Sequence, residues 1–185
     1  AKRGSSPKCA SVCFIISEAM FFLLLVSSYI VFNRASGENS PAHVLDVSRT
    51  GVFTFLLLAS SVTLWRAEHA LRNSNRQAFV NWLGLTLALG AVFLVNQGIE
   101  YAGLLRNGVT ISSSLFGSTF FTVTGFHGLH VFGGLIALAI MFYLGKTNRL
   151  TSRQSDAFGA IGYYWHFVDV VWIVVFSVIY LRVLA

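Results

Sequence analysis

The sequence predicts an all-α integral membrane protein, built as a bundle of five transmembrane helices. Its composition indicates this class, because 55% of the 185 residues are hydrophobic and only 11% are charged, whereas a soluble domain has about 25% charged residues. The spacing of apolar residues agrees, since five runs approach the roughly 20 residues that cross a bilayer. Both prolines, Pro7 and Pro41, lie outside these runs, so we expect helices without proline kinks.

The predicted spans cover residues 10–32, 50–68, 79–101, 117–144 and 160–184, within one domain of residues 1–185. The second span is the shortest, because only 16 residues separate Arg49 from Arg66. At 1.5 Å per residue this falls short of a core of about 30 Å. We therefore expect snorkelling arginines there, or a helix that continues past the membrane. The fourth span is long enough to imply a tilted helix.

The distribution of lysine and arginine predicts the orientation of the bundle, because these residues are enriched in cytoplasmic segments. Nine of the thirteen fall on the side of the N-terminus: Lys2, Arg3, Lys8, Arg66, Arg72, Arg76, Lys146, Arg149 and Arg153. The other four are Arg34, Arg49, Arg106 and Arg182. We expect the N-terminus in the cytoplasm and the C-terminus on the opposite side. The basic residues form no stripe or reader motif, which excludes nucleic acid as a partner.

Glu18 is an ionisable residue in the first predicted span, roughly 10 Å from its inner end. Ionised side chains are costly in the membrane, so such a residue is a functional candidate. Two interpretations stay open. Glu18 is either a protonated carboxyl that hydrogen-bonds to a neighbouring helix, or a carboxylate that handles protons or modulates their transfer.

The stretch GSTFFTVTGFHGLHVFGG, residues 117–134, carries two histidines in an apolar run. His127 and His130 are three residues apart and share a helix face. We expect them to hydrogen-bond across helices, at a seam where Gly134 and nearby glycines permit close packing. A metal or haem site that adds His166 is the less favoured alternative, because no thiolate or carboxylate accompanies them at a recognised ligand spacing.

Two further polar positions lie near the ends of predicted spans. His166 and Asp169 are three residues apart on one face of the fifth span, and we favour an interhelical polar clasp. Glu100 ends the third span beside Tyr101, which predicts a contact with lipid headgroups or with the interface. The sequence contains no phosphate-binding glycine loop, nucleophile elbow or HExxH motif. By its own residues, the chain is a scaffold with a few buried titratable groups.

Five segments, in order along the chain, resemble subunit III of the haem–copper respiratory oxidases. They are SEAMFF at Glu18, ASSVTLWRAEHAL, IEYAGL at Glu100, GSTFFTVTGFHGLHV and YYWHFVDVVWIVVFSVIYL. By this resemblance, His69 matches a loop histidine of the family and is a candidate for lipid or interface contact. Glu18 matches the buried carboxylate of the family that reacts with carbodiimide. Longer members have two preceding helices, and the five-helix form is typical of bacterial oxidases.

The resemblance implies a function that the residues alone do not indicate. The chain would be a non-redox subunit of a proton-pumping cytochrome c oxidase in the bacterial plasma membrane. It would bind no haem, copper or other metal and contain no catalytic centre. It would pack on subunit I, alongside subunit II and possible small subunits, and support proton uptake during oxygen reduction. Haem and copper would belong to the partner subunits, and phospholipids are possible ligands.

Other functions stay open at this stage. A subunit III of a quinol oxidase is the main alternative, and an accessory protein of nitric-oxide reduction is another. From a different class, an independent membrane channel or transporter would also have five apolar helices. The absence of internal repeats and broken helices disfavours a transporter.

Overall fold

The computed structural model describes residues 7–35, 46–112, 114–150 and 152–180, and this part of the chain folds into five α-helices. They are α1 (Pro7–Ala35), α2 (Val47–Arg72), α3 (Arg76–Arg106), α4 (Leu115–Lys146) and α5 (Ser152–Ile179). Each contains a segment long and apolar enough to cross a membrane. The predicted fold class is therefore confirmed. The orientation of the termini and the single domain stay predictions, and the last predicted residues of the fifth span, 181–184, lie outside the described residues.

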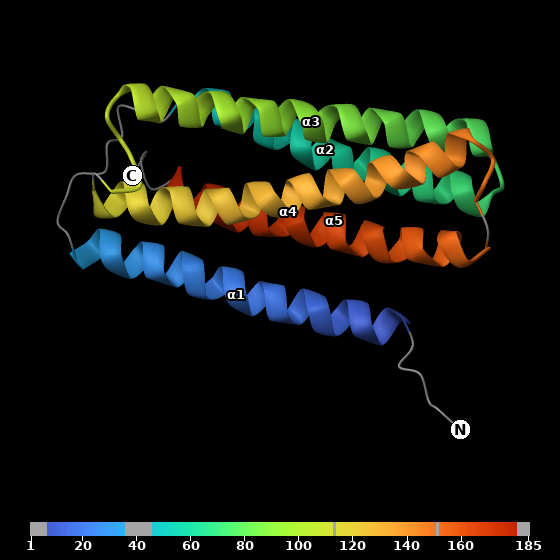
Figure 1. Cartoon of the computed structure of the whole chain (residues 1–185), viewed down its shortest axis with the longest axis horizontal. Helices are drawn as coiled ribbons and strands as arrows, with labels where there is room; N and C mark the ends of the chain where they lie inside the picture. The colour runs from blue at the N-terminus through green and yellow to red at the C-terminus, as the bar shows by residue number, and fades with distance from the viewer. Residues whose placement is uncertain (1–6, 36–45, 113, 151, 181–185) are drawn as a thin grey trace.

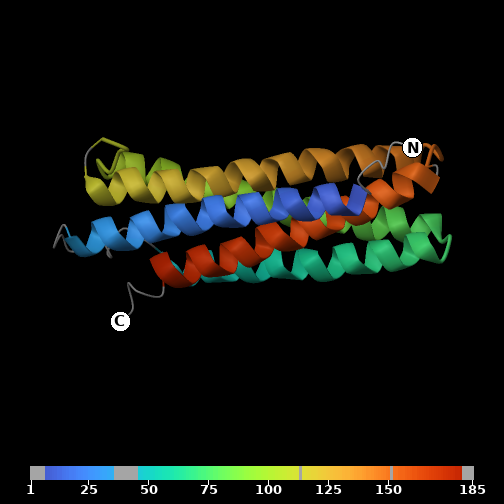
Figure 2. The ribbon, with the colours of Figure 1, turned by 90° about the horizontal axis from the view of Figure 1, so that it is seen from below.

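Helices α2, α3, α4 and α5 form a ring in which each packs on the next, and α5 closes the ring against α2. Helix α1 lies outside this ring, against α4 and α5 (Figures 1 and 2). Successive helices run in opposite directions, so the α2–α3 turn, the end of α4 and the start of α5 share one end of the bundle (Figure 1). We call this the turn end. Side chains of α5 therefore face α1, α2 and α4, which gives α5 a central place.

Short polar side chains begin three of the helices. Asp46, Asn75 and Ser114 precede α2, α3 and α4, and each accepts a hydrogen bond from a backbone N–H of the first turn. The same helices end at Ser74, Gly108 and Asn148, which have φ of 56°, 78° and 58°. A left-handed residue at this position lets the following N–H reach back to a carbonyl of the last turn. These caps hold the connections within the described residues short.

Two helices are longer than the sequence predicted. Helix α2 has 26 residues, about 39 Å, so it continues past the interval between Arg49 and Arg66. The Arg66 guanidinium lies 5.1 Å from the centre of the Trp82 ring, a position typical of a membrane interface. Helix α3 continues to Arg106, which places Glu100 about 9 Å inside the helix end.

The centre of the ring is filled by the indole of Trp165, which is 1% exposed. The side chain lies between two glycines of neighbouring helices, Gly90 on α3 and Gly134 on α4. A Cβ added to Gly134 would lie 2.8 Å from the indole, and one added to Gly90 would lie 2.9 Å from it. Helices α3 and α4 can therefore approach α5 this closely only because both positions lack a side chain. Of the seam glycines expected from the sequence, Gly134 makes the closest approach.

Candidate functional site

The most distinctive polar contact joins α1 to α4 through Glu18 and His130. The Oε2 atom of Glu18 lies 3.0 Å from Nε2 of His130, and the two side chains are 22% and 16% exposed. The imidazole packs edge-on against Phe22 of α1 at 5.0 Å between ring centres. Residues 12–32 of α1 are otherwise largely apolar, so this contact supplies a specific polar link between the outer helix and the ring.

The hydrogen bonds of His130 determine how many protons this contact holds. Its Nδ1 lies 2.7 Å from the carbonyl oxygen of Phe126, and a carbonyl only accepts, so Nδ1 carries a proton. The Nε2 atom then either accepts a hydrogen bond from a protonated Glu18 or donates one to its carboxylate. In both states a single proton lies between Nε2 and Oε2. The pair can therefore shift between a neutral form and an ion pair without exchanging a proton with its surroundings.

A second polar centre lies between α2 and α5, where Ser61 contacts both His166 and Asp169. The Ser61 hydroxyl oxygen is 2.5 Å from Oδ2 of Asp169 and 2.8 Å from Nδ1 of His166. His166 and Asp169 do not bond to each other in this arrangement, because the serine of the neighbouring helix lies between them. This is not a hydrolase triad, since the histidine rather than the serine would have to occupy the middle position.

Two tryptophans strengthen the same α2–α5 seam. Trp165 donates its indole N–H to the Ser60 hydroxyl at 3.0 Å, and Trp172 donates to the Thr54 hydroxyl at 2.9 Å. Each hydroxyl in turn donates to a backbone carbonyl of α2. Both indole donors are thus satisfied in the interior, as buried polar groups require.

His127 differs from the expectation that it would hydrogen-bond across helices. It is fully buried, and neither ring nitrogen has a hydrogen-bond partner among the described residues. Its ring stacks on Trp172 at 4.7 Å between centres, with Phe93 edge-on at 6.1 Å. The physical reason is the rotation of about 60° between positions three apart on a helix. That rotation turns His130 toward α1 and His127 into the ring.

Glu100 also differs from its expected place at the lipid interface. Its carboxylate accepts hydrogen bonds from Tyr180 at 2.9 Å, Thr50 at 3.2 Å and Gln97 at 3.4 Å. These donors come from the end of α5, from α2 and from α3 itself. Glu100 therefore joins three segments at the end of the bundle opposite the turn end, because α3 is longer than predicted.

Tyr101 and His69 occupy more peripheral positions. Tyr101 donates its hydroxyl proton to Thr124 of α4 at 2.6 Å, because the Thr124 hydroxyl proton is already donated to the Phe120 carbonyl. His69 is exposed in the last turn of α2, where its ring stacks on Trp65. Contacts of these residues with lipid or with an interface stay predictions. Within the described ranges, no group of three or more His, Cys, Asp or Glu side chains is placed to share a metal ion.

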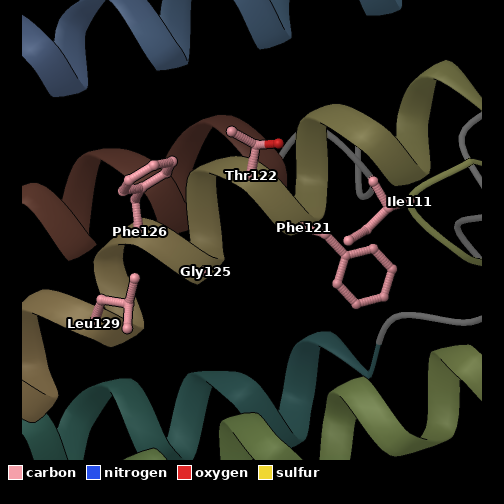
Figure 3. A pocket seen from close by; sticks show the side chains of 6 residues that line it. All are labelled: Ile111, Phe121, Thr122, Gly125, Phe126 and Leu129. Atoms are coloured by element: carbon pink, nitrogen blue, oxygen red, sulfur yellow. The ribbon is translucent and has the colours of Figure 1, made fainter.

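An open hollow of about 320 Å³ lies on α4, lined by Ile111, Phe121, Thr122, Gly125, Phe126 and Leu129 (Figure 3). The only side-chain hydroxyl among these lining residues, that of Thr122, donates to the Ser118 carbonyl of its own helix. No titratable side chain lines the hollow. It is therefore separate from both polar centres.

The sequence did not single out Ser61, which links the two residues of the expected clasp. Its signal was a pair of serines, Ser60 and Ser61, at the middle of an otherwise apolar span. Small hydroxyl residues are common at packed membrane-helix surfaces, so the pair was not distinctive. The partners of Glu100 were likewise not predictable, since they come from helices whose relative rotation the sequence does not show.

Comparisons with known proteins agree on one family. A family model described as Cytochrome c oxidase subunit III matches residues 6–183. The chain is 39% identical over 175 residues to a protein named Cytochrome c oxidase subunit 3 from Corynebacterium diphtheriae, with 92% of this chain and 85% of the relative aligned. A probable subunit 3 from Nocardia farcinica is also 39% identical, with the same shares covered. The Synechocystis protein of that name is 34% identical, with 92% of this chain and 73% of the relative aligned.

Proposed function

Because this chain belongs to the cytochrome c oxidase subunit III family, we propose that it is the non-redox subunit III of a proton-pumping terminal oxidase. The observation that carries this function is the family match over residues 6–183. The relatives named above are bacterial cytochrome c oxidase subunits, which disfavours the quinol oxidase alternative. The family also replaces the nitric-oxide and independent-channel alternatives. With five helices able to span a membrane, the chain is a multi-pass protein of the plasma membrane.

The partners and cofactors follow from this role as proposals. The chain packs on oxidase subunit I, with subunit II in the same complex, and the partner subunits hold the haem and copper. Membrane phospholipids surround the bundle. The proposed orientation, with the N-terminus in the cytoplasm, places the turn end on the cytoplasmic side, since α1 begins there (Figure 1). Nine of thirteen lysines and arginines support this orientation.

Glu18 supports proton uptake by the oxidase through its contact with His130. The carboxyl is partly exposed on the outside of the ring, so it can face a partner subunit while it stays hydrogen-bonded to α4. The pair holds one proton whose position between the two residues responds to nearby charge. A change of charge in the partner can thus be met by a shift of that proton, without a net charge appearing in the membrane.

Two substitutions of Glu18 separate the proton-handling role from a structural one. A glutamine can still donate a side-chain hydrogen bond to Nε2 of His130, but it has no titratable proton. Alanine loses both. We expect Glu18→Gln and Glu18→Ala each to shorten the turnover lifetime and lower proton pumping of the purified oxidase. The control is Ser17→Ala, because the Ser17 hydroxyl donates to the Phe14 carbonyl of its own helix.

The outcomes are distinct. If Glu18→Gln behaves as wild type while Glu18→Ala is impaired, Glu18 is structural and the proton-handling role is wrong. The subunit assignment has its own test, which is the visible absorption spectrum and subunit composition of the complex purified through this chain. Haem absorption and a copper-containing partner are expected. A colourless protein that purifies alone would overturn the assignment.

A further inference from the structure

We propose that Ser61, His166 and Asp169 form a short proton relay that ends at a buried proton-binding site, the Asp169 carboxyl. The proposal concerns the α2–α5 seam and does not depend on the role of Glu18. Its starting observation is that one hydroxyl contacts both an imidazole nitrogen and a carboxylate oxygen, at 2.8 Å and 2.5 Å.

The hydroxyl of Ser61 carries one proton, so it can donate to only one of its two partners. If it donates to Asp169, then His166 must donate to Ser61 from a protonated Nδ1. If it donates to His166, then a protonated Asp169 must donate to Ser61. The two arrangements place the same three heavy atoms in the same positions and differ only in the direction of the hydrogen bonds.

Conversion between these arrangements moves one proton from His166 to Asp169. In the first, an imidazolium donates from Nδ1 to the Ser61 oxygen, and Ser61 donates to the carboxylate. The serine then passes its own proton to Oδ2 and takes the Nδ1 proton. The products are a neutral imidazole protonated on Nε2, an unchanged serine and a neutral carboxylic acid. Charge and protons balance, and a new proton enters only through His166.

The structure also provides a route to His166 from the turn end. Glu68 of α2 lies in the same seam, 4.0 Å from the position of a Cβ at Gly159 of α5. Gly159, Gly162, His166 and Asp169 follow each other at spacings of three and four and so lie along one stripe of α5. A Cβ at Gly162 would have no atom within 4 Å. The seam between Glu68 and His166 is therefore narrow in side chains and open to small polar groups.

The far end of the relay is closed. Asp169 is 3% exposed, and its second oxygen, Oδ1, is buried without a hydrogen-bond partner among the described residues. Asp169 lies about 18 Å along α5 from residue 157, where the apolar span begins. This depth places the carboxyl near the middle of the membrane. A proton delivered there can return only by the path it came.

The charged and titratable groups around α5 distinguish this site from the α1–α4 pair. From α2, Glu68 faces His166 and is itself paired with Arg72 at 2.7 Å. From α4, His127 stacks on Trp172 of α5. From α1, Glu18 bonds His130, whose backbone carbonyl accepts from Tyr164. Positions 164 and 166 point in directions about 200° apart on a helix, so the two polar centres lie on different sides of α5.

The test follows the Asp169 carboxyl by infrared difference spectroscopy of the purified oxidase complex in vesicles. A protonated carboxylic acid has a carbonyl stretch that a carboxylate lacks. We expect a pH step on the side of the turn end to change one such band, and a step on the other side to leave it unchanged. Asp169→Asn should remove the band. Asp169→Glu should retain a carboxyl and shift it, which identifies the band even if the asparagine variant does not assemble.

The relay itself is tested by a matched pair at Ser61. Ser61→Ala removes the hydroxyl, and we expect the band to follow the pH step at least about tenfold more slowly. Ser61→Thr keeps the hydroxyl and should restore the rate. Glu18→Gln should leave both band and rate unchanged, which separates this result from failure of the proposed function. A band that does not respond to pH, or equal rates in wild type and Ser61→Ala, would mean a structural clasp only and would overturn the proposal.

Discussion

The packing of Trp165 between two glycines allows a test in which a single methyl group is added. In Gly134→Ala the new Cβ would lie 2.8 and 2.9 Å from two atoms of the indole ring, whereas carbon atoms pack best at about 3.5–4.0 Å. The ring cannot retreat, because Gly90 borders it from α3 at a similar distance. Such overpacking costs about 1–3 kcal/mol.

A matched control separates this cost from the general effect of replacing glycine in a helix. Gly98 lies on α3 with no atom within 4 Å of a would-be Cβ. Gly98→Ala should therefore show only the gain in helix propensity, roughly 1 kcal/mol. Gly134→Ala has the same gain and the overpacking cost. The free energies of unfolding of the two variants should then differ by about 1–3 kcal/mol, with Gly134→Ala the less stable.

The measurement is reversible unfolding in mixed micelles, followed by circular dichroism. A double-mutant cycle with Trp165→Phe gives a second readout, because the smaller ring removes the atoms that the new methyl group meets. We expect Gly134→Ala to cost less in that background. Equal stability of Gly134→Ala and Gly98→Ala, or no coupling to Trp165→Phe, would refute the reasoning that the two glycines set the approach of α3 and α4 to α5.

Two further predictions concern the turn end of the bundle. Arg76 donates from Nε to the Gly145 carbonyl at 2.6 Å and from its terminal nitrogen to the Lys146 carbonyl, so Arg76→Ala should lower the free energy of unfolding by about 1 kcal/mol. Arg76→Lys should recover part of this loss, and stability equal to wild type in the alanine variant would show that the contact contributes nothing. Ser74 has a φ of 56°, so Ser74→Gly should stabilise the chain by roughly 1 kcal/mol, because glycine adopts this conformation without strain. An unchanged or lower unfolding midpoint for Ser74→Gly would contradict that account.

Much of the fold could be predicted from the sequence because it depends on local properties. Five apolar runs of membrane length predict five helices, since every backbone polar group must be satisfied within its own segment in lipid. The identity of the polar candidates was equally local. Glu18 and His130 were both recognised, because an ionisable group in an apolar run is conspicuous wherever it points.

The pairings depended on the tertiary structure, because they follow from how each helix is rotated about its axis. His127 and His130 lie three residues apart, yet one stacks on Trp172 inside the ring and the other bonds Glu18 outside it. Glu100 was placed at the interface only because the end of α3 was predicted too early. Helix ends are set by caps and by packing, which a hydropathy pattern does not resolve.

The sequence by itself determined that this chain is a five-helix membrane protein with a few ionisable groups inside, and its motifs indicated the family. Only the tertiary structure decided that Ser61 lies between His166 and Asp169, and that Trp165 fills the space left by Gly90 and Gly134. The physical reason is that hydrophobicity acts on each segment separately. Hydrogen bonds and close packing instead require two helices to meet at one depth and one angle.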